Sequence, residues 1–213
     1  DLVGYGADPA YVVQQAMDLV AAGYTVIGGN HDAFAVQPPA GTDKGAHSMA
    51  AQGALWTHEQ LSPEQRSFLA HLPLTAQVGG VLLVHASAEA PENWRYVDNE
   101  IVAAECLEAA TQHPGVQHVF CGHVHQQTLY YRGTGRGLMR FTPTAGVPVP
   151  VPPHRQWVGT VGSVGQPRDG DPRAMYALLD TDHWHLRFER VPYAVADAAA
   201  AILATRGALP ASF

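Results

Sequence analysis

Residues 116–125 have the sequence VQHVFCGHVH, in which an apolar, strand-like run ends at Gly122-His123-Val124-His125. Successive side chains of an extended chain point to opposite sides, so the two histidines of a His-x-His motif lie on the same side. Such a motif is compatible with a metal site and also with two structural histidines. Other metal-binding side chains at the ends of neighbouring strands would favour the metal site.

Three further motifs have this placement. The apolar residues 24–27 predict a short buried strand that leads into GNHD at 29–32, and the hairpin-like run 78–84 ends at His85. The chain as given starts with Asp1. Carboxyl ends of strands in an open α/β sheet meet at one edge, where these side chains would converge. Asp, Asn and His supply the oxygen and nitrogen ligands that borderline divalent metals accept, so the motifs together predict one metal site.

Each motif alone is a weak signal. A lone histidine after an apolar strand, such as His85, is more often structural than a ligand. Asn30 and Asp32 could bond to the backbone of a turn. Their joint occurrence, each at a strand end, favours a common site over coincidence.

The composition fits a globular enzyme. A chain of 213 residues predicts a single domain over 1–213, and 46% apolar with 15% charged residues argues against disorder. A net charge of −7 argues against a protein that binds DNA non-specifically, because such a protein needs a basic face to neutralise phosphates. No run of eighteen apolar residues occurs, so we expect no membrane partner.

The cysteine pattern favours a cytoplasmic protein. Cys106 and Cys121 form no CxxC pair, so we expect two buried free thiols in a reducing compartment. No charged leader followed by an apolar segment is present, so no signal peptide is expected.

The periodicity changes half-way along the chain. Helices are expected from Pro9 to Gly23 with Asp8 as N-cap, from Ser62 to His71, and over 99–112 and 194–205, whereas residues 33–53 predict a loop with a short helix near its end. Strand-like runs follow one another in the second half, at 128–131, 138–141, 156–158, 175–179 and 184–191. This order predicts a layered α/β domain with a mixed sheet or two facing sheets.

The motifs resemble those of the calcineurin-like metallophosphoesterases, in particular the small prokaryotic subgroup. The pattern of that family is D-x-H, GD, GNH[DE], a separate H and GHxH. GNHD at 29–32 and GHVH at 122–125 match directly, and His85 matches the separate histidine. Residues 1–9 resemble the stretch that begins with the Asp of the GD motif, and 162–168 resemble the glycine-rich stretch after GHxH. The D-x-H motif and its strand would lie before residue 1.

The resemblance implies a layered α/β/β/α sandwich of two mixed sheets flanked by helices. It also implies a two-metal site, with Mn, Fe, Zn or Ni as the ions. Asp1 would bridge both metals; Asn30, His85 and His123 would complete one site, and His125 would serve the other. His31 would act near the leaving-group oxygen, with Asp32 as its orienting partner. Two alternatives stay open: Asp32 as a helix or turn cap, and Arg168 as either a phosphate contact or a loop salt bridge.

The expected activity is hydrolysis of a phosphate monoester or diester by a metal-bound hydroxide at this site. The alternative is a catalytically degenerate binding or scaffold module on the same fold; the presence of His31 favours the enzyme. A third interpretation is a structural domain in which metal only fixes the fold. The expected substrate is a small phosphate ester, and the sequence leaves the oligomeric state open.

Overall fold

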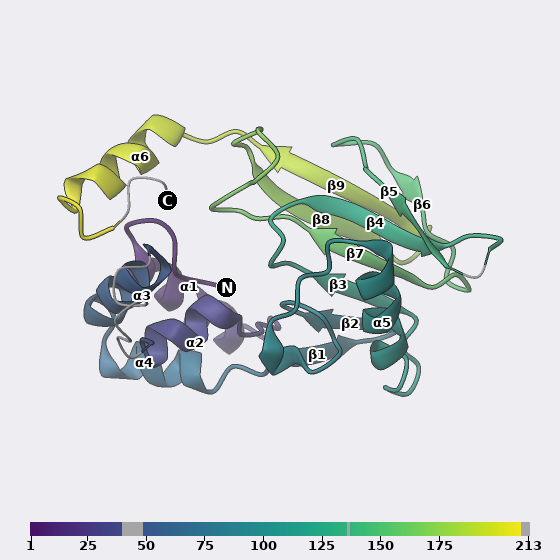
Figure 1. Cartoon of the computed structure of the whole chain (residues 1–213), viewed down its shortest axis with the longest axis horizontal. Coiled ribbons are helices and arrows are strands. Elements are labelled where there is room, and N and C mark those ends of the chain that lie inside the picture. The colour runs from purple at the N-terminus through teal and green to yellow at the C-terminus, as the bar shows by residue number, and fades with distance from the viewer. Residues whose placement is uncertain (40–48, 136, 210–213) are drawn as a thin grey trace. The chain divides into compact units, whose positions relative to one another are not determined.

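The computed structural model describes residues 1–39, 49–135 and 137–209. The described chain divides into two compact units: a helical unit, Asp1–Leu74 with Ala194–Phe213, and a β unit, Thr75–Tyr193. Figure 1 shows the helices of the first unit and the sheets of the second. The single domain expected over 1–213 stays a prediction. In the described part of the chain, no helix combines the length and the apolar character needed to cross a membrane.

The helical unit contains α1 (Pro9–Ala21), α2 (Asn30–Val36), α3 (Met49–Gln60), α4 (Pro63–Ala70) and α6 (Val195–Ala204). Its core is an apolar cluster formed by the buried side chains of Val3, Val13, Ala35, Leu61 and Leu69. The predicted start of α4 is confirmed. The Ser62 side chain accepts from the N–H of Gln65, and the Gln65 side chain accepts from the N–H of Ser62.

Three predictions for the helical unit need correction. Residues 24–27 form no strand in the described chain. They make no backbone pairing with another strand, and an extended segment becomes a β-strand only through such pairing. The loop expected over 33–53 overlaps α2, whereas the short helix expected near its end is present as the start of α3; residues 40–48 lie outside the described residues. Helix α1 begins at Pro9 as predicted, but the side chain of Asp8 makes no capping hydrogen bond.

The β unit contains two sheets in its described residues. The first has the order β1-β2-β3-β7-β4-β5 and the second the order β6-β9-β8. The strands are β1 (Thr75–Val78), β2 (Val81–Val84), β3 (His118–Cys121), β4 (Gln127–Arg132), β5 (Leu138–Phe141), β6 (Val149–Pro150), β7 (Trp157–Val161), β8 (Ala174–Asp180) and β9 (His185–Val191). In the first sheet β2, β3 and β7 run parallel, and the other pairs are antiparallel.

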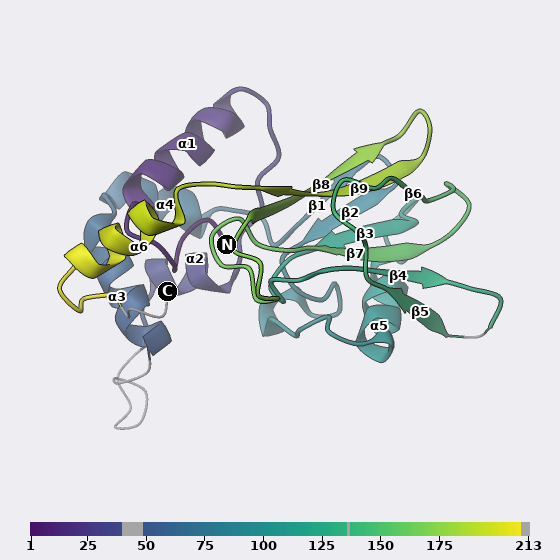
Figure 2. The same ribbon diagram turned by 90° about the horizontal axis from the view of Figure 1, so that it is seen from above.

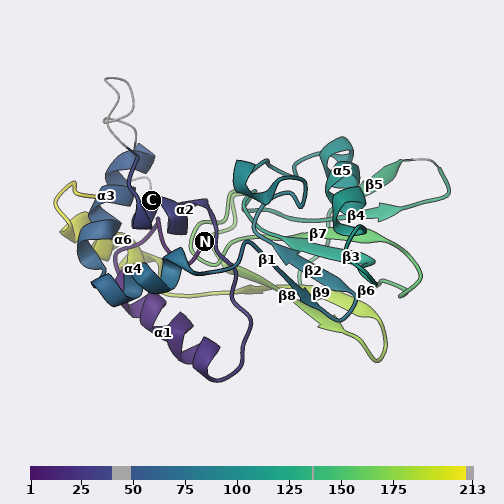
Figure 3. The same cartoon turned by 90° about the horizontal axis from the view of Figure 1, so that it is seen from below.

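The layers follow from the alternation along the strands. Val119 and Cys121 of β3 pack against α5 (Glu100–Ala110), whereas Phe120 between them faces the second sheet, next to Trp157 and Phe188. Helix α5 therefore covers one face of the first sheet (Figure 3), and the second sheet covers the other. The predicted layering with two sheets is confirmed.

The second sheet differs from the prediction in one respect, because it is antiparallel rather than mixed. Strands β8 and β9 form a hairpin (Figure 2), and a short turn can join two strands only when they run antiparallel.

A buried histidine lies between the two sheets. The ring of His118, on β3, is 1% exposed and stacks on Trp157 at 4.6 Å between centroids, with Trp184 at 5.3 Å. Its Nδ1 has no hydrogen-bond partner among the described residues. Burial disfavours the charged form and lowers the pKa of His118 to about 4.

This burial predicts a stability that depends on pH. The unfolded chain binds a proton at His118 near pH 6.5 and the folded chain only near pH 4, so stability falls as the pH falls between these values. We expect a loss of roughly 2–3 kcal/mol over this window. Urea unfolding followed by tryptophan fluorescence from pH 7 to 4.5 measures it. His118→Phe should flatten the slope; an unchanged slope would assign the pH dependence to other groups.

Candidate metal centre

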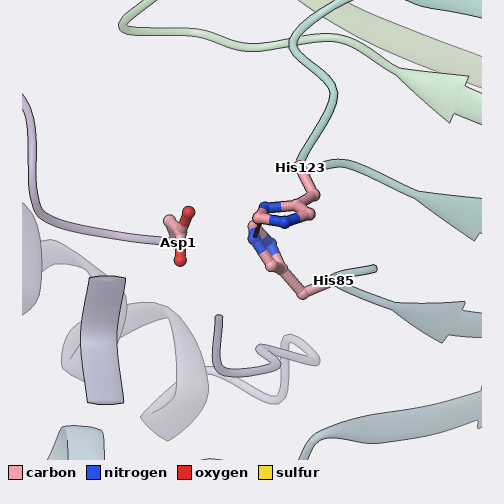
Figure 4. Close-up of side chains that lie close together, drawn as sticks. All are labelled: Asp1, His85 and His123. Atoms are coloured by element: carbon pink, nitrogen blue, oxygen red, sulfur yellow. Dashed lines mark hydrogen bonds between the residues drawn. The ribbon is translucent and has the colours of Figure 1, made fainter. Parts of the chain in front are cut away.

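His85 and His123 meet at the ends of two adjacent strands. β2 and β3 run parallel, so the residues that follow them lie at the same edge of the sheet. The N–H of Gly122 donates to the carbonyl oxygen of His85 at 2.9 Å, which joins the two strand ends. The His85 Nε2 and His123 Nδ1 atoms lie 3.1 Å apart (Figure 4), and both residues are 7% exposed. Figure 4 also labels Asp1, which belongs to the helical unit.

The spacing of these nitrogens fits a shared metal ion. Imidazole nitrogens bind zinc-like ions at about 2.0–2.1 Å, so two neighbouring ligands on one ion lie roughly 2.9–3.4 Å apart. The observed 3.1 Å falls within this range and also suits an N–H···N hydrogen bond in the metal-free protein. Two buried imidazoles at this distance can therefore accept a divalent cation with little rearrangement.

The ring of His125 is held by the segment after β7. Its Nδ1 lies 2.7 Å from the carbonyl oxygen of Gln166. A carbonyl only accepts, so Nδ1 carries the proton and Nε2 keeps the lone pair that a metal needs. Burial, followed by the charge of Arg168, lowers the pKa of His125 to about 4, which keeps the ring neutral near pH 7. His125 is thus in the state that binds metal.

The backbone at both histidines of the GHVH motif is unusual. His123 and His125 have φ values of +64° and +57°, the left-handed region that few residues other than glycine adopt. The N–H of Arg168 donates to the carbonyl oxygen of His125 at 3.1 Å and supports this conformation. Strain of this kind persists where the surrounding contacts hold it, and it is common at functional sites.

The helical unit arranges a second group of polar side chains around the start of α2. The N–H of His31 donates to Oδ1 of Asp1 at 2.8 Å. Gly29 permits this contact, since a Cβ at that position would overlap the Asp1 carboxylate. The ring of His31 lies 4.6 Å from that of Tyr5 and 5.9 Å from that of Phe34. Asn30 and His31 are both 8% exposed, so these side chains have defined surroundings.

Residues 2–183 match the family described as the calcineurin-like phosphoesterase superfamily domain. The chain belongs to this superfamily. Membership supports phosphoester hydrolysis as the general activity and divalent metals as the general cofactor, and it agrees with the histidine pair of the β unit.

Two solved structures and one sequence relative resemble this chain. A metallophosphoesterase from Sphaerobacter thermophilus is 30% identical, with a TM-score of 0.78 over 100% of this chain and 82% of that one. The hypothetical protein PH1004 from Pyrococcus horikoshii OT3, at 19% identity and a TM-score of 0.68, shares the fold over 99% of this chain and 79% of its own. The uncharacterized protein MJ0912 of Methanocaldococcus jannaschii is 28% identical over 97% of this chain and 79% of its own length.

Asp32 acts as a cap at the start of α2. The residue is 1% exposed; its Oδ1 accepts from the N–H groups of Leu2 and Val3, and its Oδ2 accepts from the N–H of Gly29. The capping alternative that the sequence left open is therefore present at the start of α2. A role for Asp32 in orienting His31 stays a prediction.

Arg168 lies beside the histidines in the same unit. Its guanidinium donates to Oε1 of Gln166 at 2.8 and 3.1 Å, within the same loop. The loop salt bridge that the sequence left open stays a prediction. A phosphate contact by Arg168 stays a prediction, as do the ligand roles of Asp1, Asn30, His85, His123 and His125.

One charged residue of the β unit, Arg190 on β9, was not predicted from the sequence as important for the site. Its guanidinium pairs with Asp169 and donates to Oε1 of Gln127 at 3.3 Å, and its side chain is 10% exposed. The hydrogen bond from Arg190 lowers the pKa of Asp169. The sequence did carry a signal for Arg190, because it continues the alternation of the buried residues Leu186 and Phe188 along the strand. This alternation places the Arg190 side chain on the inward side of the strand, where a charge needs a partner.

Proposed function

We propose that this chain hydrolyses a phosphate monoester or diester at a two-metal site. In this proposal Asp1 is shared by both metals, Asn30, His85 and His123 complete one site, and His125 belongs to the other. Family membership and the 3.1 Å spacing of the His85 and His123 nitrogens support it, and that spacing is the observation on which the proposal rests. Bound divalent ions, with Mn, Fe, Zn and Ni as candidates, would neutralise phosphoryl charge and lower the pKa of a shared water.

His31 has a different role in the proposal. Its backbone N–H is tied to the Asp1 carboxylate, and Tyr5 and Phe34 flank its ring. A ring held in this way beside a proposed metal ligand can stabilise the charge that develops on the leaving-group oxygen, or donate a proton to it. His31 would therefore contribute to turnover and little to metal binding.

The proposed substrate is a small phosphate ester, because the chain carries a net charge of −7 and lacks the excess of basic residues that binding to nucleic acid requires. Cys106 and Cys121 are both buried free thiols, which supports the cytoplasm as the proposed location. A catalytically degenerate binding or scaffold module remains the alternative function, and turnover measurements separate the two.

Replacing His31 by alanine tests the proposal. The wild-type chain should hydrolyse a chromogenic phosphate monoester or diester when manganese is added. His31→Ala should lower kcat about a hundredfold, the scale of lost acid–base assistance, while the manganese content after dialysis stays at the wild-type value.

The matched control is His71→Ala, since His71 is an exposed histidine of the same unit and bonds to the carbonyl of Ser67. The control should retain wild-type turnover. If no phosphate ester is turned over with any of the four metals, the binding-module alternative replaces the enzyme.

A further inference from the structure

Two aromatic side chains border the histidine pair of the β unit. Both come from the segment between β2 and α5. The ring of Tyr96 stacks on His123 with centroids 3.9 Å apart and planes at 16°, and the ring of Trp94 meets His85 edge-on at 5.9 Å and 72°. Each proposed metal ligand of this pair therefore has an aromatic neighbour.

Tyr96 keeps a large part of its surface exposed. Its exposed fraction is 46%, although the next residue, Val97, is 1% exposed and anchors the segment in the core. The stack covers the ring face that meets His123, which leaves the opposite face and the edge of the Tyr96 ring to account for the exposed surface. An aromatic face next to a proposed metal ligand is available to a bound molecule.

The segment that carries these rings is held in place. The N–H of Ser87 donates to the carbonyl oxygen of Arg95 at 3.1 Å. The Arg95 guanidinium pairs with Glu89 at 2.7 Å and with Glu105 of α5 at 2.6 Å. The rings are thus presented by a braced loop rather than by a mobile one, which reduces the entropy lost when a ligand binds.

Trp94 provides an independent observation. Its φ is +53°, in the left-handed region, which is an outlier for a bulky side chain and strains the backbone. A fold that needed only a turn here could place glycine or asparagine at this position. The strain is retained together with an indole ring beside His85, which favours a role for that ring in the site.

We propose that Trp94 and Tyr96 form an aromatic platform that binds a flat ring in the alcohol part of the phosphate ester. This inference rests on the proposed function and names its substrate class: esters whose phosphate is joined to an aryl or nucleoside group. Aromatic faces attract flat π systems, and stacking on one ring strengthens binding roughly 5- to 150-fold.

Pairs of non-hydrolysable ligands that differ only in the ring test the platform. Binding of phenylphosphonate and methylphosphonate to the manganese-loaded full chain is measured by calorimetry. The nucleoside pair consists of the phosphonate analogues of AMP and ribose 5-phosphate, in which a methylene group replaces the ester oxygen. The wild type should bind the ring-bearing member of at least one pair about tenfold tighter or more. The pair with the larger ratio of dissociation constants shows which group the platform prefers, an aryl or a nucleoside group.

The variants separate stacking from ligand orientation. Tyr96→Leu and Trp94→Leu should bring the ratio of the two dissociation constants toward one. Tyr96→Phe, which keeps an aromatic ring, should keep the ratio of the wild type. Tyr176→Leu is the control, since Tyr176 is 42% exposed on β8 and should leave the ratio unchanged. Equal weakening of both ligands in Tyr96→Leu, or no ring preference in the wild type, would overturn the platform. Phosphonate binding without turnover of any ester would instead count against the proposed function.

Discussion

Replacing His123 by alanine is expected to lower kcat/KM for phosphate ester hydrolysis about a thousandfold or more. The His123 Nδ1 and His85 Nε2 atoms are 3.1 Å apart. The loss of His123 therefore removes one of the two imidazoles proposed to bind the same ion. Transition-state stabilisation by a metal is worth several kcal/mol, and about 4 kcal/mol corresponds to a thousandfold change in rate. The manganese content after dialysis should fall in the same variant, which separates His123 from His31.

The measurement compares metal content and kcat/KM of the same preparations. His154→Ala is the control, because His154 is an exposed histidine of the β unit. The control should match the wild type in both quantities. A His123→Ala protein that keeps its metal and its turnover would remove His123 from the site and with it the main support for the two-metal proposal.

The β unit was predictable because its strands carry a local signal. Alternating runs such as 184–191 show which side chains face inward, and β9 (His185–Val191) follows that pattern. Residues 24–27 have the same apolar character and yet form no strand in the described chain. Strand formation depends on a partner that is distant in sequence, and composition alone does not supply it.

Helix α2 was left open by the sequence. A turn was one alternative for Asn30 and Asp32, because both residues favour such positions, and a helix cap was another for Asp32. In the structure α2 begins at Asn30, and the Asp32 side chain caps it by accepting the N–H of Gly29. The same hydrogen bond closes a turn or caps a helix, so the local sequence left both outcomes open.

Some side chains around the candidate metal centre could be predicted from the sequence, and others could not. His85, His123 and His125 could be found because they follow strand-like runs, and His31 could be found because it belongs to the GNHD motif. Tyr96 and Arg190 belong to no motif, and their importance arises from contacts across the fold. Arg190 had only an indirect signal, its place on the inward side of β9.

Replacing Arg190 by methionine is expected to lower both the stability of the β unit and the metal affinity of His125. Arg190 donates to Gln127, two residues after His125, and pairs with Asp169, three residues after Gln166. The carbonyl of Gln166 in turn fixes the His125 ring. Loss of Arg190 leaves Asp169 without this charge partner, which costs about 2–3 kcal/mol. Loosening a group that orients a metal ligand lowers metal affinity about 10- to 100-fold.

Arg187→Met provides the comparison that isolates this role. Arg187 lies on the same strand and pairs with Glu189, but its side chain is 45% exposed, so its loss should cost less than about 1 kcal/mol and leave metal affinity unchanged. Urea unfolding and manganese titration of both variants give the two quantities. If Arg190→Met loses stability while its metal affinity stays at the wild-type value, Arg190 only supports the fold. If both quantities fall together, and Arg190→Lys recovers part of the metal affinity, the charge on β9 controls the position of His125 through Asp169 and Gln166.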